Sequence, residues 1–267
     1  MKVTRTIDET RAALQATRDA GDRIGLVPTM GAFHEGHLSL IRAARAESDR
    51  VVVSLFVNPT QFGADEDLGR YPRDEARDAA LAEAEGADLL FAPSADEIYP
   101  PGFTTWIDVG ELGEILEGAA RPGHFKGVAT VCCKLFEIVR PAQAYFGRKD
   151  AQQVAVVKQV VRDLNLGLVI RAMPTVRDAD GLALSSRNRY LSSEERQEAL
   201  KLPRALAAGL EAYRGGRDAV SVACELLTGV DVDYVTIADL DGPTLAAAVR
   251  IGSVRLIDNL RLEEEAA

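Results

Sequence analysis

The chain has 267 residues, 47% apolar and 27% charged, and its 31 basic against 41 acidic side chains give a net charge of −10 at pH 7. This apolar content can bury a packed core, which excludes disorder as the main state, and the length suits one large domain or two modest ones. An isoelectric point of about 4.9 argues against a nucleic-acid partner, because the phosphate backbone would repel most of the surface. A local basic pocket for a small anion stays compatible with that charge.

The sequence contains no run near the ~18 apolar residues that would span a membrane. Residues 1–21 form a charge-rich amphipathic segment without the apolar centre of a signal peptide, so we expect a cytoplasmic protein. Three cysteines, with Cys132 and Cys133 adjacent, form neither a disulfide framework nor a metal-ligand spacing. We interpret them as small buried apolar side chains.

Apolar β-branched runs alternate with helical patterns over the first two thirds of the chain, which predicts βαβ units and a parallel sheet of the α/β class. The expected strands are residues 23–28, 50–57, 87–92, 142–146 and 168–173. The expected helices, with apolar residues at i, i+3 and i+4, are residues 38–47, 74–85, 127–139 and 151–164. Residues 104–109 have the composition of a further strand that lacks a crossover partner.

The pattern changes after Pro174, where a polar stretch precedes a long Ala- and Glu-rich helix at residues 193–213. We therefore place a domain boundary near residue 175, with residues 1–175 in a first domain and 176–267 in a small α+β domain. The second domain is expected to hold a helix at 218–228, a strand at 233–238, a short helix after Pro243 and a strand at 253–259. Residues 262–267 are expected to be a solvated tail.

Two histidines, His34 and His37, follow the strand at 23–28, at the edge where open α/β sheets bind ligands. Gly31 and Gly36 permit tight turns, and the start of the next helix favours an anion, so phosphate is the natural occupant. Imidazoles there can donate hydrogen bonds to oxygens whose charge grows during nucleotidyl transfer. The alternative is an ordinary turn with surface histidines. A zinc site is disfavoured, because no third ligand has a suitable spacing.

Two amide side chains, Asn58 and Gln61, follow the strand at 50–57 and can fix a small polar ligand. An Asn-Pro turn with a solvated glutamine explains them equally well. After the strand at 142–146, Gly147 allows a turn, Lys149 supplies a positive charge for a phosphate, and Asp150 is placed to cap a helix. That cap alone is a purely structural alternative.

A polar segment at the domain junction, residues 184–188, holds two hydroxyls and a guanidinium that could clamp an anion. A Ser-rich linker followed by the cap of the next helix is the alternative. The basic segment at residues 121–126 contains His124, and both a mobile lid and a plain surface loop are compatible with its Pro and Gly.

These segments together resemble one family, the pantothenate synthetases (pantoate–β-alanine ligases), over nearly the whole chain. The matching stretches, in the family's order and spacing, are PTMGAFHEGHLSLI, FVNPTQFG followed by RYPRD, RPGHFKGVATVCCKLF, FGRKDAQQ and PTVRDADGLALSSRN. The HxGH motif alone indicates only the nucleotidyltransferase superfamily, whereas FVNPTQF and GRKDAQQ narrow it to this family. Phe33 stands where leucine is more familiar in the family, and Leu184 stands where methionine is also seen. Both residues keep an apolar side chain at these positions.

The resemblance implies a Rossmann-like doubly wound enzyme, usually a homodimer, whose first domain binds ATP and pantoate and whose second acts as a lid. It implies that ATP and Mg²⁺ drive the condensation of pantoate with β-alanine through pantoyl adenylate, with release of AMP and pyrophosphate. No protein ligand for Mg²⁺ is assigned, because ATP phosphates and water can hold the ion.

The resemblance also implies site residues, of which His34, His37 and Lys149 are catalytic, with His37 as the proton donor. Gln61 and Gln153 are implied to hold pantoate, and Asn58 and Gln61 to lie near β-alanine. The residues implied to bind ATP are Met30, Gly31, Ala32, Phe33, His34, Glu35, Gly36, His37, Gly147, Arg148, Lys149, Asp150, Val176, Leu184, Ser185, Ser186 and Arg187.

Three alternatives share the HxGH motif or the nucleotide site. One is a superfamily enzyme that leaves a stable dinucleotide-like product, and another is a class I tRNA synthetase, which is disfavoured because no tRNA-binding module is recognisable. A regulatory nucleotide binder is the third. It has no physical need for paired histidines, a lysine and two amides at neighbouring strand ends.

Overall fold

The computed structural model describes residues 1–63 and 68–263, so most of the expected C-terminal tail, residues 264–267, lies outside the described residues. The chain forms two compact units. Unit 1 comprises Met1–Phe146 and Gln152–Met173, and unit 2 comprises Gly147–Ala151 and Pro174–Ala267. Residues 147–151, which the sequence-based boundary assigns to the first domain, therefore pack with unit 2.

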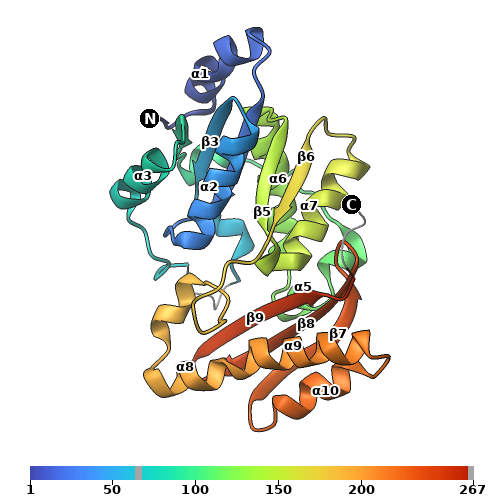
Figure 1. Ribbon diagram of the computed structural model, residues 1–267. Helices are drawn as coiled ribbons and strands as arrows, with labels where there is room; N and C mark the ends of the chain where they lie inside the picture. Colours follow the sequence, from blue (N-terminus) through green and yellow to red (C-terminus); the bar gives the residue numbers. More distant parts are fainter. Residues whose placement is uncertain (64–67, 264–267) are drawn as a thin grey trace. The chain divides into compact units, whose positions relative to one another are not determined.

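Unit 1 is built on a six-stranded parallel sheet whose strands β3, β5 and β6 are labelled in Figure 1. In sheet order the strands are β1 (Lys2–Thr4), β4 (Leu89–Phe91), β3 (Arg50–Leu55), β2 (Ile24–Thr29), β5 (Gln143–Gly147) and β6 (Val169–Met173). From β2 the chain winds through β3 to β4 on one side and then crosses to β5 and β6 on the other. The doubly wound α/β class is confirmed, and its direction reverses between β2 and β5, where such sheets bind ligands.

The helices of unit 1 connect these strands. They are α1 (Ile7–Asp19), α2 (Glu35–Glu47), α3 (Glu75–Ala84), α4 (Ala95–Ile98), α5 (Glu117–Ala120), α6 (His124–Val139) and α7 (Ala151–Asp163), with 3₁₀ turns η1 (Pro59–Gln61) and η2 (Gly110–Gly113). The four helices expected here are confirmed within a few residues. Two of them, α2 and α6, begin earlier than their apolar pattern suggests, because His34 and Gly123 serve as N-terminal caps.

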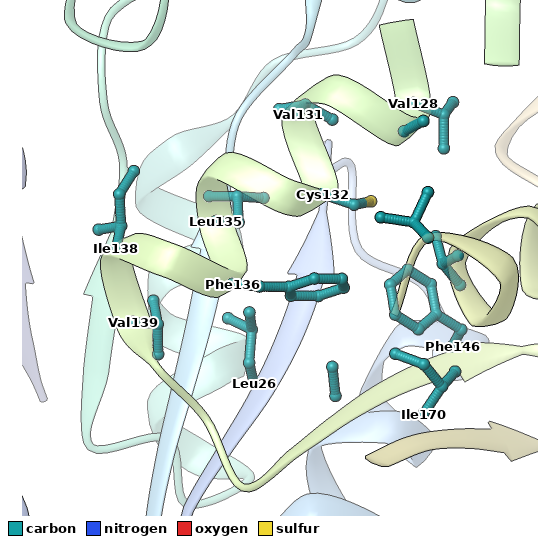
Figure 2. Close-up of a cluster of buried hydrophobic side chains, with 14 of the residues drawn as sticks. Leu26, Val128, Val131, Cys132, Leu135, Phe136, Ile138, Val139, Phe146 and Ile170 are labelled. Atoms are coloured by element: carbon teal, nitrogen blue, oxygen red, sulfur yellow. The ribbon is translucent and has the colours of Figure 1, made fainter. Parts of the chain in front are cut away.

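The core beneath the sheet is formed by α6, which is apolar on most of its surface (Figure 2). The ring of Phe136 meets that of Phe146 nearly edge-on, with centroids 6.4 Å apart and planes at 86°. Cys132 lies in this cluster, and burial raises the pKa of its thiol to about 12, which keeps it protonated. The interpretation of buried cysteines is wrong for Cys224, which is exposed on α10 beside the buried Ala223.

The expected strand at residues 104–109 is wrong, because this segment has no strand partner among the residues that the structure describes. Its backbone is held by a side chain instead, since the Ile107 N–H donates to the Thr130 hydroxyl at 3.0 Å. Trp106, in the same segment, packs on the rings of Tyr99 and Phe103.

Unit 2 contains a three-stranded antiparallel sheet in the order β7 (Asp231–Asp239), β8 (Pro243–Ile251) and β9 (Val254–Arg261). Figure 1 shows helices α9 and α10 running along this sheet. The helical elements of unit 2 are η3 (Arg148–Asp150), η4 (Ser186–Tyr190), α8 (Ser193–Ala199), α9 (Lys201–Arg214) and α10 (Ala219–Leu226). In the described ranges, no helix of either unit combines the length and the apolar character needed to cross a bilayer.

Two expectations for unit 2 are wrong. The short helix after Pro243 is the central strand β8, where pairing on both edges and burial of Leu245 and three alanines override the helix propensity of alanine. The single long helix at 193–213 is two helices that meet at Leu200. Pro203 has no N–H to donate to the carbonyl of Ala199, so the first helix ends there.

Candidate active site

The turn after β2 places the two histidines in reciprocal hydrogen bonds at the start of α2. The Nδ1 atom of His34 accepts from the Gly36 N–H at 3.2 Å, and that of His37 accepts from the His34 N–H at 3.4 Å. The ring centroids lie 4.2 Å apart. Because each Nδ1 accepts, each neutral ring carries its proton on Nε2. Both imidazoles are therefore set as Nε2–H donors, which suits them to phosphate oxygens.

This turn is supported from α3 and from the chain before it. Gly31 has φ of 72°, and a Cβ there would come within 2.5 Å of the Asp78 carboxylate. Asp78 accepts the Phe33 N–H at 2.8 Å, while Tyr71 donates to the Gly31 carbonyl at 2.6 Å and Arg77 to the Phe33 carbonyl at 3.2 Å. Burial raises the pKa of Asp78. Sequence reasoning missed this carboxylate, which lies far along the chain from the turn.

The second polar segment, η1, follows β3, which pairs in parallel with β2. Asn58 is 1% exposed, and its Nδ2 donates to Gln61 Oε1 at 3.1 Å and to the Gly127 carbonyl at 3.3 Å. Its Oδ1 accepts from the Tyr99 hydroxyl at 3.0 Å. Asn58 thus fixes the Gln61 amide, whose Nε2 donates to none of residues 1–63 and 68–263. Gln61 is therefore set to donate to a bound oxygen.

The basic segment at 121–126 packs against the same turn. His124 is buried, its Nδ1 lies 2.8 Å from the Gln61 carbonyl, and Arg121 donates to that carbonyl at 3.2 Å. Since a carbonyl only accepts, Nδ1 carries the proton and Nε2 faces the Arg121 guanidinium at 3.1 Å. The interpretation of a plain surface loop is wrong for these residues. A Cβ on Gly127 would meet the Thr60 carbonyl at 2.5 Å, so only glycine lets α6 approach η1 this closely.

Two glutamines open α7, and they differ in their surroundings. Gln152 is buried, donates to the carbonyls of Leu112 and Ile115 at 2.8 Å, and accepts the Glu117 N–H at 3.0 Å. It therefore braces the loop around η2. Gln153 is half-buried, and its side chain has no hydrogen bond to any residue in the described parts of the chain. The side-chain amide of Gln153 is therefore available to a ligand.

In unit 2, the turn η3 carries the cationic residues expected near phosphate. The Lys149 ammonium lies 3.2 Å from Asp150 Oδ1, and the Arg148 guanidinium lies 3.5 Å from Asp241. The Lys149 side chain keeps 22% of its surface exposed, so it can exchange the neighbouring carboxylate for a more highly charged ligand.

The segment at 176–188 is a hairpin followed by a 3₁₀ turn. The Leu184 N–H donates to the Val176 carbonyl at 3.0 Å, which closes the hairpin. The Ser185 hydroxyl accepts the Arg187 N–H at 3.3 Å and caps η4, in which Ser186 is the first residue. The stretch is thus a hairpin and a turn, and Ser192, which follows it, caps the helix α8, as the alternative of a linker before a helix cap expects.

The family model described as Pantoate-beta-alanine ligase matches residues 2–261. The chain belongs to the pantoate–β-alanine ligase family. A pantothenate synthetase of Roseiflexus castenholzii is 55% identical over 98% of this chain and 100% of its own length, and one of Heliobacterium modesticaldum is 53% identical over 98% and 100%.

Solved structures of the family agree. A pantothenate synthetase from Thermus thermophilus is 46% identical, with a TM-score of 0.93, over 99% of this chain and 100% of that one. The pantoate–β-alanine ligase from Francisella tularensis, complexed with beta-gamma ATP and β-alanine, is 37% identical with a TM-score of 0.85 over 99% and 98%. Members of this family ligate pantoate to β-alanine with ATP as a substrate, and membership sets aside the alternatives that share only the HxGH motif.

We expect Asp78→Asn to change how stability depends on pH. The side-chain amide of the variant still offers an oxygen to the Phe33 N–H, but it carries no charge whose burial would cost free energy. Because burial raises the pKa of Asp78 above its ordinary value of 3.8, the native state holds this proton longer than the unfolded chain. This carboxyl therefore makes the wild type lose stability as pH rises from about 3.8 up to its folded pKa. Urea unfolding should show that the free energy of unfolding of the variant rises relative to that of the wild type across this pH range.

Asp78→Ala is the matched comparison. It leaves the Phe33 N–H without its acceptor, so it should be about 1–3 kcal/mol less stable than Asp78→Asn at every pH. Parallel stability curves for the wild type and Asp78→Asn would contradict the assigned role of burial.

We expect Gly127→Ala to destabilise the protein and to raise KM for pantoate. Alanine favours a helix by about 1 kcal/mol over glycine, but overpacking against η1 costs about 1–3 kcal/mol and displaces Gln61. Gly167→Ala is the control, since a Cβ there meets nothing within 4 Å. Urea unfolding and steady-state kinetics measure both effects, and indistinguishable behaviour of the two variants would refute the packing argument.

Proposed function

We propose that the chain makes pantothenate in two chemical steps. The pantoate carboxylate attacks the α-phosphorus of ATP, forming pantoyl adenylate and releasing pyrophosphate. The amine of β-alanine then attacks the acyl carbon, forming the amide and releasing AMP. A free carboxylate and an amine do not condense readily in water, so the protein must align them and shield the mixed anhydride from hydrolysis.

The observation that carries this proposal is the pair of reciprocal hydrogen bonds at the start of α2. Those bonds commit Nδ1 of both His34 and His37 and set Nε2–H of each as a donor. Preorganised donors stabilise oxygens whose negative charge increases in the transition state. We assign both rings to the ATP phosphates, with His37 giving a proton to the leaving pyrophosphate. The backbone of residues 30–36 completes this part of the ATP site.

Pantoate is held by amides in this proposal. Gln61 has its Oε1 occupied by Asn58, so its Nε2 can donate to a pantoate oxygen, and Gln153 supplies a second amide. Gln61 also lies close to β-alanine in the proposed arrangement. Asn58 acts through Gln61, because its own polar atoms are already bonded within the fold.

Residues of unit 2 complete the proposed ATP contacts. Lys149 neutralises charge at the α-phosphate and the pyrophosphate, and Asp150 orients the nucleoside. The remaining contacts are assigned to Gly147, Arg148, Val176, Leu184, Ser185, Ser186 and Arg187, with Val176 toward adenine through its backbone and the hydroxyls and guanidinium toward pyrophosphate. The small C-terminal domain acts as a lid over bound ligand.

Mg²⁺ belongs to the same proposal. When bound, the ion neutralises part of the triphosphate charge. In residues 1–63 and 68–263, no group of three or more His, Cys, Asp or Glu is placed to hold a metal. Mg²⁺ usually keeps several waters and binds through the phosphates of the substrate. We therefore propose that the ATP phosphates and water hold the ion. We also propose that the enzyme is a cytoplasmic homodimer.

Release of pyrophosphate without β-alanine tests the function. ATP and pantoate alone should give a single turnover of pyrophosphate, and AMP should accumulate only after the amine is added. His34→Asn should keep the melting temperature, because asparagine is a good helix cap and its Oδ1 can replace Nδ1. Without the Nε2–H donor, pyrophosphate release should fall by about 10² to 10³.

His34→Ala removes the cap as well, so it should match the asparagine variant in rate and fall below it in melting temperature. Normal pyrophosphate release by His34→Asn would contradict the role of the ring, and pyrophosphate release that requires the amine would contradict the adenylate.

Gln153→Ala should raise KM for pantoate and leave KM for ATP nearly unchanged. A hydrogen bond to a carboxylate is worth about 1.5–3 kcal/mol, which corresponds to roughly 10- to 100-fold in KM. The exposed Gln197→Ala serves as the control and should change neither constant. An equal rise of both constants in Gln153→Ala would rule out a pantoate contact.

A further inference from the structure

The buried side chain of Asn259, on β9, is hydrogen-bonded to the backbone of η3, the turn that carries Lys149. Its Nδ2 donates to the backbone carbonyls of Arg148 and Lys149, at 2.9 Å in each case. Both partners are oxygens that only accept, so the nitrogen of this amide must face them. Asn259 is 8% exposed, and its two N–H groups match the two carbonyls.

The strand beneath the turn is itself fixed. Asp258 is buried, and its carboxylate accepts the Asn259 N–H at 2.8 Å and two hydrogen bonds from Arg177 at 2.6 and 3.0 Å. Asn259 also pairs with Ala246 in the ladder between β9 and β8. The backbone of Asn259 therefore has little freedom, and the carbonyls of η3 are held at a defined place on the sheet.

We propose that Asn259 is a positioning residue that sets the ammonium of Lys149 for phosphate. This inference rests on the proposed role of Lys149. Asn259 touches no reacting atom, so it acts only through η3. A displacement of about 1 Å at a catalytic group can cost about 10²-fold in rate, so two hydrogen bonds that locate this turn have consequences well beyond stability.

A double-mutant cycle with Lys149 tests the proposal in the full-length enzyme. Asn259→Ala should lower the rate of pyrophosphate release by about 10- to 100-fold and raise KM for ATP, because the ammonium is misplaced. KM for pantoate should not change, since Gln61 and Gln153 remain intact. In the Lys149→Ala background, the same substitution should have little further effect on the rate.

Two further variants separate positioning from folding. Asn259→Asp keeps the shape of the side chain but offers a carboxylate to two carbonyls, so it should be no more active than Asn259→Ala. Asp218→Ala removes the cap of α10 in the same unit and lowers the melting temperature without touching η3, so its pyrophosphate release should stay near the wild-type rate.

The outcomes are distinct. Independent, multiplicative losses for Asn259→Ala and Lys149→Ala would overturn the positioning role, as would an Asn259→Ala enzyme no slower than Asp218→Ala. Wild-type activity of Lys149→Ala would instead overturn the proposed role of the lysine, and the inference with it.

Discussion

The hydrogen bonds that the rings of His34 and His37 accept from the backbone at the start of α2 determine which nitrogen of each ring can donate to a ligand. A serine cap would satisfy the helix equally well, but its hydroxyl would have to donate from the same atom that accepts the backbone N–H. The imidazole satisfies the backbone with Nδ1 and still carries a proton on Nε2, so one side chain both ends the turn and presents a donor. The same geometry that stabilises the helix therefore orients the donors that we propose for the ATP phosphates.

Each turn of the candidate site is supported by a buried polar side chain, which is distant in sequence for Asp78 and Asn259 and local for Asn58. Asp78 holds the turn after β2, Asn58 orients Gln61, and Asn259 holds the carbonyls beneath Lys149. Burying such groups is costly unless they are hydrogen-bonded, and each of these three has the partners that offset the cost. Because amides and carboxylates have defined bonding directions, they place a backbone more exactly than apolar packing does.

The proposed reaction needs little from the protein beyond charge stabilisation and alignment. The carboxylate of pantoate and the amine of β-alanine are themselves the nucleophiles, so no enzyme side chain needs to form a covalent bond. Donors such as Nε2–H of His34 and the amide of Gln61 do their work by being in place before the transition state forms. In this proposal the buried polar contacts therefore serve to fix turns, and they are not needed to activate a nucleophile.

The sequence by itself determined the parallel α/β sheet and most helices, because these depend on local periodicity, and it indicated the histidines, amides and lysine of the candidate site, because these residue types follow strands. The doubly wound order was implied by the family resemblance. Sequence reasoning failed at β8 and at residues 104–109, where pairing partners outside the segment decide the conformation. Tertiary structure alone revealed Asp78 and Asn259, whose importance comes from contacts across long stretches of chain. A hydrogen bond between distant residues leaves no periodic trace in the sequence, so only the folded chain shows which buried polar groups hold the site.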